Sequence, residues 1–155
     1  MAIFEPMKWK WFLLTAVVMI SCDDYSECGV SDYSEEVYIG LYNSSDSSSK
    51  KVTFDQIEVI YADATTLQII DLVESSSYKL PIDLSSNSTN FTFTLDATSY
   101  DLRIDYNAQA RIENPDCGPI FRVTAIEAQS TAFDSVAVKV KELSKNLAPH
   151  VEIYF

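Results

Sequence analysis

The side chains best suited to covalent chemistry in this 155-residue chain are its three cysteines, Cys22, Cys28 and Cys117. A thiol can be acylated, can ligate a metal ion or can form a disulfide, and its surroundings decide among these fates. Cys22 directly follows an apolar run, whereas Cys28 and Cys117 lie in polar segments. The three cysteines are therefore candidates for different roles.

Residues 1–21 have the three-part pattern of a secretory signal peptide. Lys8 and Lys10 give a short basic start, residues 11–20 are predominantly apolar, and the small residue Ser21 precedes Cys22. An apolar run of about ten residues is roughly half of what a membrane-spanning helix needs. We therefore expect residues 1–21 to direct export and to be removed.

The residues Met19, Ile20, Ser21 and Cys22 resemble the lipobox of bacterial lipoproteins. In that class of signals, the cysteine becomes the first residue after cleavage and carries acyl chains. The resemblance implies lipidation of Cys22, and several acyl chains would hold the protein firmly at a membrane. The alternative is ordinary secretion with Cys22 free.

Lipidation of Cys22 would leave Cys28 and Cys117 as an even pair in an oxidising compartment, where thiols form disulfides. A Cys28–Cys117 bridge would close a loop of about ninety residues and restrain the unfolded chain by about 4–5 kcal/mol. Two alternatives stay open at this point. Both thiols could be free and buried, or Cys22 could pair with Cys28.

The segment that follows Cys22 is strongly acidic, beginning with Asp23, Asp24 and Glu27. Residues 22–35 are therefore predicted to form a solvated tether between anchor and domain. The acidic start also resembles the surface-export signal of Bacteroidota lipoproteins. That resemblance implies transfer to the outer face of the outer membrane.

Other candidates for catalysis or metal binding are few. His150 is the only histidine, so a histidine-based triad or a multi-histidine metal site is not expected, and we expect a surface or strand-end position for it. Asp101 and Asp105 share the wet face of one predicted strand about 13 Å apart, too far for a glycosidase pair. We therefore predict no catalytic residue, no metal ligand and no cofactor.

Composition and charge narrow the partners further. The chain has 11 Lys and Arg against 23 Asp and Glu, a net charge of −12, which excludes nucleic acid because nothing could neutralise a run of phosphates. Its three glycines leave no glycine-rich phosphate loop. The tripeptide Asp134-Ser135-Val136 resembles the Bacteroidota O-glycosylation motif, which implies Ser135 as a modification site.

The elements that must position these residues are strands. In residues 100–113, apolar or aromatic side chains alternate strictly with polar ones, as in an antiparallel strand with one buried face. Shorter runs of the same kind are separated by Ser- and Asn-rich connections at 43–51 and 84–90. The pattern predicts an all-β fold, an antiparallel β-sandwich of about 8–9 strands that is Ig-like or transthyretin-like.

Local departures from the alternation predict finer features. The run at 100–113 exceeds a usual strand, so we expect a bend or a bulge near Asn107, and a change of parity predicts a bulge at Asp55-Gln56. Pro81 assigns its strand to a sheet edge. Residues 67–73 are mostly apolar, and 120–128 are mixed enough to predict burial on both faces. Residues 138–147 are the one place where a short helix competes.

Several short motifs occur in a fixed order along the chain: a cysteine soon after the lipobox, Leu80-Pro81-Ile82, Phe91-Thr92-Phe93, the long alternating strand that leads into Cys117-Gly118, and the final run from His150 to Phe155. Together they resemble a family of uncharacterised Bacteroidota lipoproteins, a domain of unknown function. The resemblance spans nearly all of the chain after residue 21. It implies lipid attachment and a small β domain, and it brings no activity, cofactor or ligand.

The sequence thus predicts a signal peptide at 1–21, an acidic tether at 22–35 and a β-sandwich at 36–155. We expect a lipoprotein anchored in the outer membrane, on its periplasmic side or at the cell surface. Its domain is expected to be a non-enzymatic binding, adaptor or structural module for an unknown protein or glycan. The alternative is a carboxylate-based hydrolase or a glycan-binding lipoprotein of the cell envelope.

Overall fold

The computed structural model describes residues 33–70, 72–112, 118–145 and 148–155. The described residues belong to one compact unit, Ser31–Phe155. Within them, no helical segment reaches the length and apolarity that a membrane span requires. The strands are β1 (Glu36–Tyr42), β2 (Gln56–Ile60), β3 (Thr66–Ile69), β4 (Ser77–Pro81), β5 (Ser88–Leu95), β6 (Thr98–Arg111), β7 (Ile120–Gln129), β8 (Ser135–Val138) and β9 (Val151–Tyr154).

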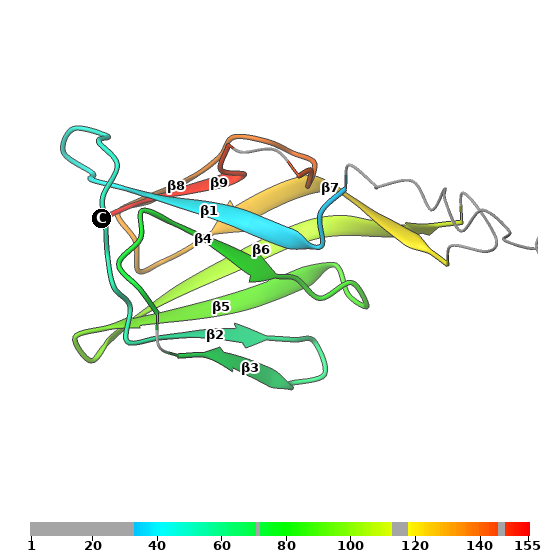
Figure 1. Ribbon diagram of the computed structural model, residues 1–155, viewed down its shortest axis with the longest axis horizontal. Helices are drawn as coiled ribbons and strands as arrows, with labels where there is room; N and C mark the ends of the chain where they lie inside the picture. The colour runs from blue at the N-terminus through cyan, green and yellow to red at the C-terminus, as the bar shows by residue number, and fades with distance from the viewer. Residues whose placement is uncertain (1–32, 71, 113–117, 146–147) are drawn as a thin grey trace, which may run out of the picture. The chain divides into compact units, whose positions relative to one another are not determined.

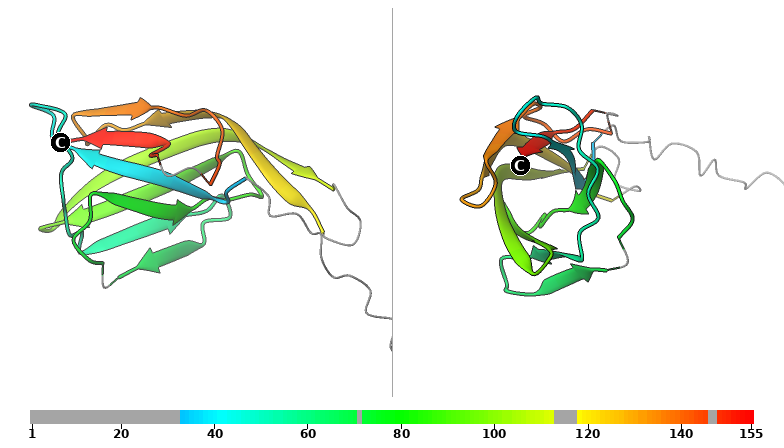
Figure 2. Two further views of the ribbon diagram at one scale, coloured as in Figure 1. Left: turned by 45° about the horizontal axis from the view of Figure 1, so that its top comes forward. Right: turned by 90° about the vertical axis from the view of Figure 1, so that its left-hand side faces the viewer.

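These nine strands form two sheets that face one another, so the predicted β-sandwich is confirmed (Figures 1 and 2). One sheet has the order β4-β1-β9-β8, and the other has the order β3-β2-β5-β6-β7. The apolar side chains that alternate along the strands point inward and fill the space between the sheets. Phe91 and Phe93 of β5 and Leu102 and Ile104 of β6 are at most 1% exposed, because every second residue of a strand points to the same face.

One strand pairing departs from the antiparallel expectation. β1 runs parallel to β9, with Ile39 opposite Val151 and Leu41 opposite Ile153, whereas the other pairs of named strands are antiparallel. The pairing places the last strand in the interior of the four-stranded sheet, beside the first. Alternation alone tells which residues face inward, but it does not tell which strand lies alongside, so the sequence did not predict this pair.

The bulge expected near Asn107 is present, with its extra residue on the partner strand β7. Asp105 pairs with Glu127 and Asn107 with Thr124, so two steps along β6 match three along β7. Ala125 of β7 has a φ of 55°, the left-handed conformation found at such bulges. The prediction that 120–128 is buried on both faces is wrong. Its mixed pattern arises because the bulge shifts the inward positions, leaving Val123 and Ile126 buried.

The other local expectations have mixed outcomes. β4, which ends at Pro81, is an edge strand as predicted. No bulged strand continues through 55–56, because the chain bends at Asp55 and β2 begins at Gln56. The described residues of 138–147 contain no helix, and Leu143 instead donates its backbone N–H to the carbonyl of Val123 at 2.9 Å.

Candidate functional site

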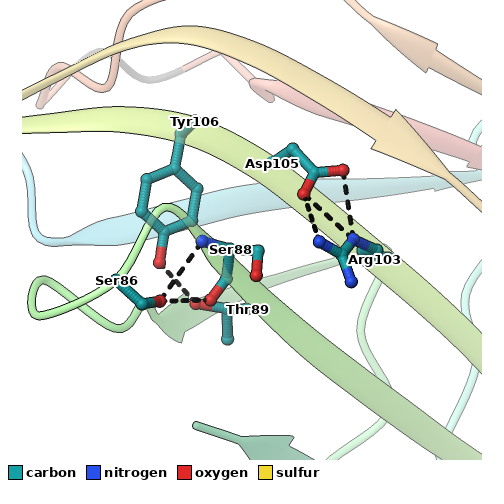
Figure 3. Close-up of polar contacts among 6 residues, drawn as sticks. All are labelled: Ser86, Ser88, Thr89, Arg103, Asp105 and Tyr106. Atoms are coloured by element: carbon teal, nitrogen blue, oxygen red, sulfur yellow. Dashed lines mark hydrogen bonds and ion pairs between the residues drawn. The ribbon is translucent and has the colours of Figure 1, made fainter. Parts of the chain in front are cut away.

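A polar cluster lies on the inner side of β5 and β6; we call it the Asp83 cluster, and in it Asp83, Thr89 and Tyr106 are buried and Ser85 is exposed. The phenol of Tyr106 donates to the Asp83 carbonyl at 2.7 Å. The same phenol lies 2.7 Å from the Thr89 hydroxyl (Figure 3). The Asp83 backbone N–H donates to Thr89 Oγ1 at 2.8 Å. Since the phenol proton goes to the carbonyl, the Thr89 hydroxyl must donate to Tyr106 Oη. Every proton in this triangle therefore has an acceptor.

The carboxylate of Asp83 extends the cluster into a neighbouring turn. It accepts the backbone N–H groups of Ala62 and Ser85, each at 2.9 Å, and also the Ser85 hydroxyl. These donors, the Ser85 hydroxyl above all, hold the pKa of the Asp83 carboxyl below its ordinary value. The carboxylate thus joins the β2–β3 turn to the segment before β5, and its hydrogen-bonding capacity serves the fold.

His150 serves the fold in a similar way within the other sheet. The Tyr38 backbone N–H donates to His150 Nδ1 at 2.9 Å, and the His150 backbone N–H donates to the Tyr38 carbonyl at 2.7 Å. Because Nδ1 accepts a hydrogen bond, the ring proton resides on Nε2, which lies 3.1 Å from the Ser144 carbonyl. The neutral imidazole therefore connects β1 to the segment that follows β8.

The strand-end position expected for His150 is confirmed, but the surface position is wrong, because the residue is only 1% exposed. The preceding residue, Pro149, packs closely on β1 at Gly40, where a Cβ would lie 2.8 Å from Pro149 Cγ. Burial lowers the pKa of His150 below its ordinary value of 6.5; the hydrogen bond to the Ser144 carbonyl opposes the shift and the Lys79 charge reinforces it. The imidazole is held neutral and is not placed as a base.

The outer side of β5 and β6 carries a different polar surface, which we call the outer-face hollow. Asn90 of β5 lies opposite Arg103 of β6, and Arg103 lies opposite Gln129 of β7, so the three form one row across the sheet. The hollow has a volume of about 550 Å³. It is lined by Ile60, Asn90, Phe91, Thr92, Asp101, Leu102, Arg103, Gln129, Ser130 and Thr131.

The charged groups of the outer-face hollow are already paired, whereas its amides are not. Arg103 contacts Asp105 through Nε and Nη2 at 2.9 and 2.8 Å (Figure 3), and Thr92 donates to Asp101 at 2.9 Å. Asp101 and Asp105 thus have separate partners and do not share a proton. The amides of Asn90 and Gln129 have no hydrogen-bond partner among the residues that the structure describes. The hollow therefore offers hydrogen-bonding groups to a polar ligand.

Several predicted site residues lie outside the described residues: Cys22, Asp23, Asp24, Glu27, Cys28 and Cys117. Lipidation, the export signal and the Cys28–Cys117 disulfide accordingly stay predictions. Ser135 is exposed at the start of β8, where it pairs with Tyr154, and its glycosylation also stays a prediction. In the ranges that the structure describes, no three His, Cys, Asp or Glu side chains are grouped so that they could hold a metal ion.

The row of Asn90, Arg103 and Gln129 was not recognised from the sequence as a site. Its members occupy polar positions of three alternating runs, and alternation is the only signal that they give. Their proximity depends on the strand order β5-β6-β7 and on the register between the strands.

A family model described as a family of unknown function (DUF6452) matches residues 56–155. The match spans β2 to β9, and it includes the Asp83 cluster, His150 and the outer-face hollow. No curated protein and no solved structure matches the chain.

Proposed function

This chain belongs to the DUF6452 family of unknown function, and from its own residues we propose a membrane-anchored bacterial lipoprotein with a non-enzymatic binding or adaptor domain. The contrast between its buried and its exposed polar groups carries the proposal. Asp83, Thr89 and His150 are hydrogen-bonded inside the fold, whereas the outer-face hollow presents amides with no partner among the described residues. Amides suit hydrogen bonding to a partner better than they suit proton transfer or nucleophilic attack.

Anchoring of the proposed lipoprotein rests on the signal peptide and on the lipobox-like residues before Cys22. Radiolabelled palmitate should enter the wild-type chain and should not enter the Cys22→Ala variant, because the acylated thiol is then absent. Label retained in Cys22→Ala would exclude lipidation at that residue. We place the protein at the outer membrane of a bacterium of the Bacteroidota type.

The second part of the proposed location is the face of the outer membrane on which the domain lies. If Asp23, Asp24 and Glu27 direct export, protease added to intact cells should remove the domain from the wild type. Replacing the three acids by alanine should then protect the domain. Equal cleavage of both forms would show that these acids do not direct export.

The predicted Cys28–Cys117 disulfide would connect the tether to the domain. Thiol titration of the denatured, unreduced wild type should find neither thiol reactive, and two reactive thiols would eliminate the bridge. Cys117→Ser should lower the free energy of unfolding by about 2–5 kcal/mol, the usual cost of losing a native disulfide in a small secreted domain.

The proposed contact site is the outer-face hollow, and the proposed partner is a protein or a glycan that presents hydrogen-bonding groups. A tagged full chain with Asn90→Ala and Gln129→Ala should lose the envelope component that co-purifies with the wild type. Gln109→Ala is the matched control, because it removes an exposed amide from β6 outside the hollow. Retention of the component by the double variant would exclude the hollow as the contact site.

The same envelope extract can show whether the partner is a glycan or a protein. Mild periodate treatment of the envelope extract before capture should abolish binding of a glycan, because it cleaves vicinal diols. Binding that survives the treatment and is removed by protease would identify a protein partner.

A further inference from the structure

The two sheets have four edge strands, and three of these are protected against pairing with another chain. β4 carries the exposed Lys79 and ends at Pro81, two residue types that blunt an edge. β7 and β8 lie beside one another, and the segment after β8 closes this side, with Ile126 N–H donating to the Lys141 carbonyl and Leu143 N–H to the Val123 carbonyl. β3 remains as the fourth edge.

The β3 edge has none of these protections. Its residues Thr66–Ile69 include no charge and no proline, and its outer side pairs with no strand among the described residues. Figures 1 and 2 both show β3 at the margin of its sheet. An uncharged free edge of this kind is a template for pairing with a further strand.

Apolar side chains are also exposed along this edge. Leu67 and Ile69 lie opposite Val59 and Ile57, which are fully buried, so they belong to the core face of the sheet. Leu67 is nevertheless 42% exposed, because the four-stranded sheet does not cover the core face this far out. Ile70 and Val73, which follow β3, are 62% and 74% exposed. Apolar surface thus stays exposed at β3 and just after it.

We propose that β3 pairs antiparallel with β3 of a second copy of this chain, about a two-fold axis at Gln68. This register sets Leu67 of each copy opposite Ile69 of the other, on the core face of both. The apolar rows Val59–Leu67 and Ile57–Ile69 then continue into each other across the axis. A register centred one half-step away would place core-face residues opposite outer-face residues, so the two-fold must coincide with a residue, and Gln68 is the residue that sets Leu67 opposite Ile69.

Charge favours this occupant despite the net charge of −12. The nearest acid on the neighbouring strand is Glu58, which accepts a hydrogen bond from Gln68 at 2.9 Å within the same copy. Across the axis the two Glu58 residues would be three strand spacings apart, about 14 Å. That distance exceeds the Debye length of about 8 Å at physiological ionic strength, so their repulsion is largely screened. A foreign strand with charged residues would find no complementary charge on β3.

Cross-linking of the full chain tests the proposal. A cysteine at the axis lies close to its own copy in the dimer, so Gln68→Cys should give a covalent dimer with a short bis-maleimide in mild-detergent lysate. The parent chain gives the background from Cys22, Cys28 and Cys117, and Lys79→Cys on the protected β4 edge is the matched control. Both should stay at background.

A second variant shows that the apolar pairing is responsible. Leu67→Lys, added to Gln68→Cys, places a charge on the core face of each β3 and should abolish the dimer, while circular dichroism shows the fold unchanged. The proposal is overturned by no dimer from Gln68→Cys, by equal dimer from Lys79→Cys, or by dimer that survives Leu67→Lys. A cross-linked product whose mass differs from two copies would show that another protein occupies the edge.

Discussion

Within β5, and likewise within β6, two residues that are neighbours in sequence lie on opposite faces of the sheet and have opposite environments. Thr89 is fully buried and takes part in the Asp83 cluster, while its neighbour Asn90 is exposed in the outer-face hollow. Tyr106 is 6% exposed and bonds inward, while its neighbour Asp105 pairs with Arg103 on the outside. Polar side chains therefore support the fold on the inner face, whereas those on the outer face are exposed to solvent and to a partner.

The difference arises because water reaches the outer face of the sheet and does not reach the inner face. A buried polar group that loses its partner has no solvent to replace it, so each bond in the Asp83 cluster matters to stability. On the outer face, water competes for every group and screens every charge. Substitutions on the inner face should therefore change the free energy of unfolding, and substitutions on the outer face should change binding.

Asp83→Ala is expected to have the largest effect on stability. It removes a carboxylate that accepts the N–H groups of Ala62 and Ser85, and hydrogen bonds to a charged group contribute more than neutral ones. The free energy of unfolding, measured by urea denaturation, should fall by about 2–3 kcal/mol. Asp105→Ala is the matched control on the outer face, and an equal loss in both variants would contradict the comparison.

Tyr106→Phe should have an intermediate effect. The ring stays in the core, but the Asp83 carbonyl and the Thr89 hydroxyl lose the phenol as partner. We expect a loss of about 1–2 kcal/mol in the free energy of unfolding. Tyr100→Phe on the same strand is the control, since the Tyr100 hydroxyl has no hydrogen-bond partner among the described residues, and it should leave stability unchanged. An unchanged free energy of unfolding in Tyr106→Phe would show that the hydrogen bonds among Tyr106, Thr89 and Asp83 do not support the fold.

His150 should give a smaller, pH-dependent effect. Because its pKa is lowered in the folded state, the unfolded chain binds the proton more readily. Stability should be full above pH 6.5 and should decrease as pH falls from there toward the lowered folded-state value. His150 is the only histidine, so the decrease between pH 6.5 and about 5 has one assignable source, since carboxylates titrate mainly below that range.

His150→Asn is the control for this pH dependence, since the amide oxygen can replace Nδ1 as acceptor for the Tyr38 N–H without titrating. Urea denaturation at a series of pH values should show the decrease in the wild type and not in His150→Asn. An identical slope in both would assign the effect to other groups.

Arg103→Ala should have the smallest effect on stability. The Arg103–Asp105 pair is solvent-exposed, with 53% of the arginine side chain accessible, and exposed ion pairs contribute little. We expect no measurable change in the urea midpoint, at low or at high salt. A clear loss of stability would mean that the outer face also supports the fold, which would remove the contrast between the two faces.

Much of this arrangement could be predicted from local pattern. Period-two alternation identified β5 and β6 and the inward direction of Phe91, Phe93, Leu102 and Ile104, since a side chain's face follows from its parity. Pro81 correctly identified an edge because proline cannot donate to a ladder. The candidate site could not be predicted in this way, because Asn90, Arg103 and Gln129 are far apart in sequence and only the strand order makes them neighbours.

The sequence by itself determined that this chain forms strands, which side of each strand is apolar, and where the turns interrupt them, because these depend on neighbouring residues alone. The tertiary structure decided what depends on distant residues. It set the parallel β1–β9 pair, placed the bulge residue at Ala125 instead of on β6, and buried His150 against Tyr38. It also left β3 as a free edge. These outcomes follow from which strands lie side by side, and alternation is compatible with many such orders.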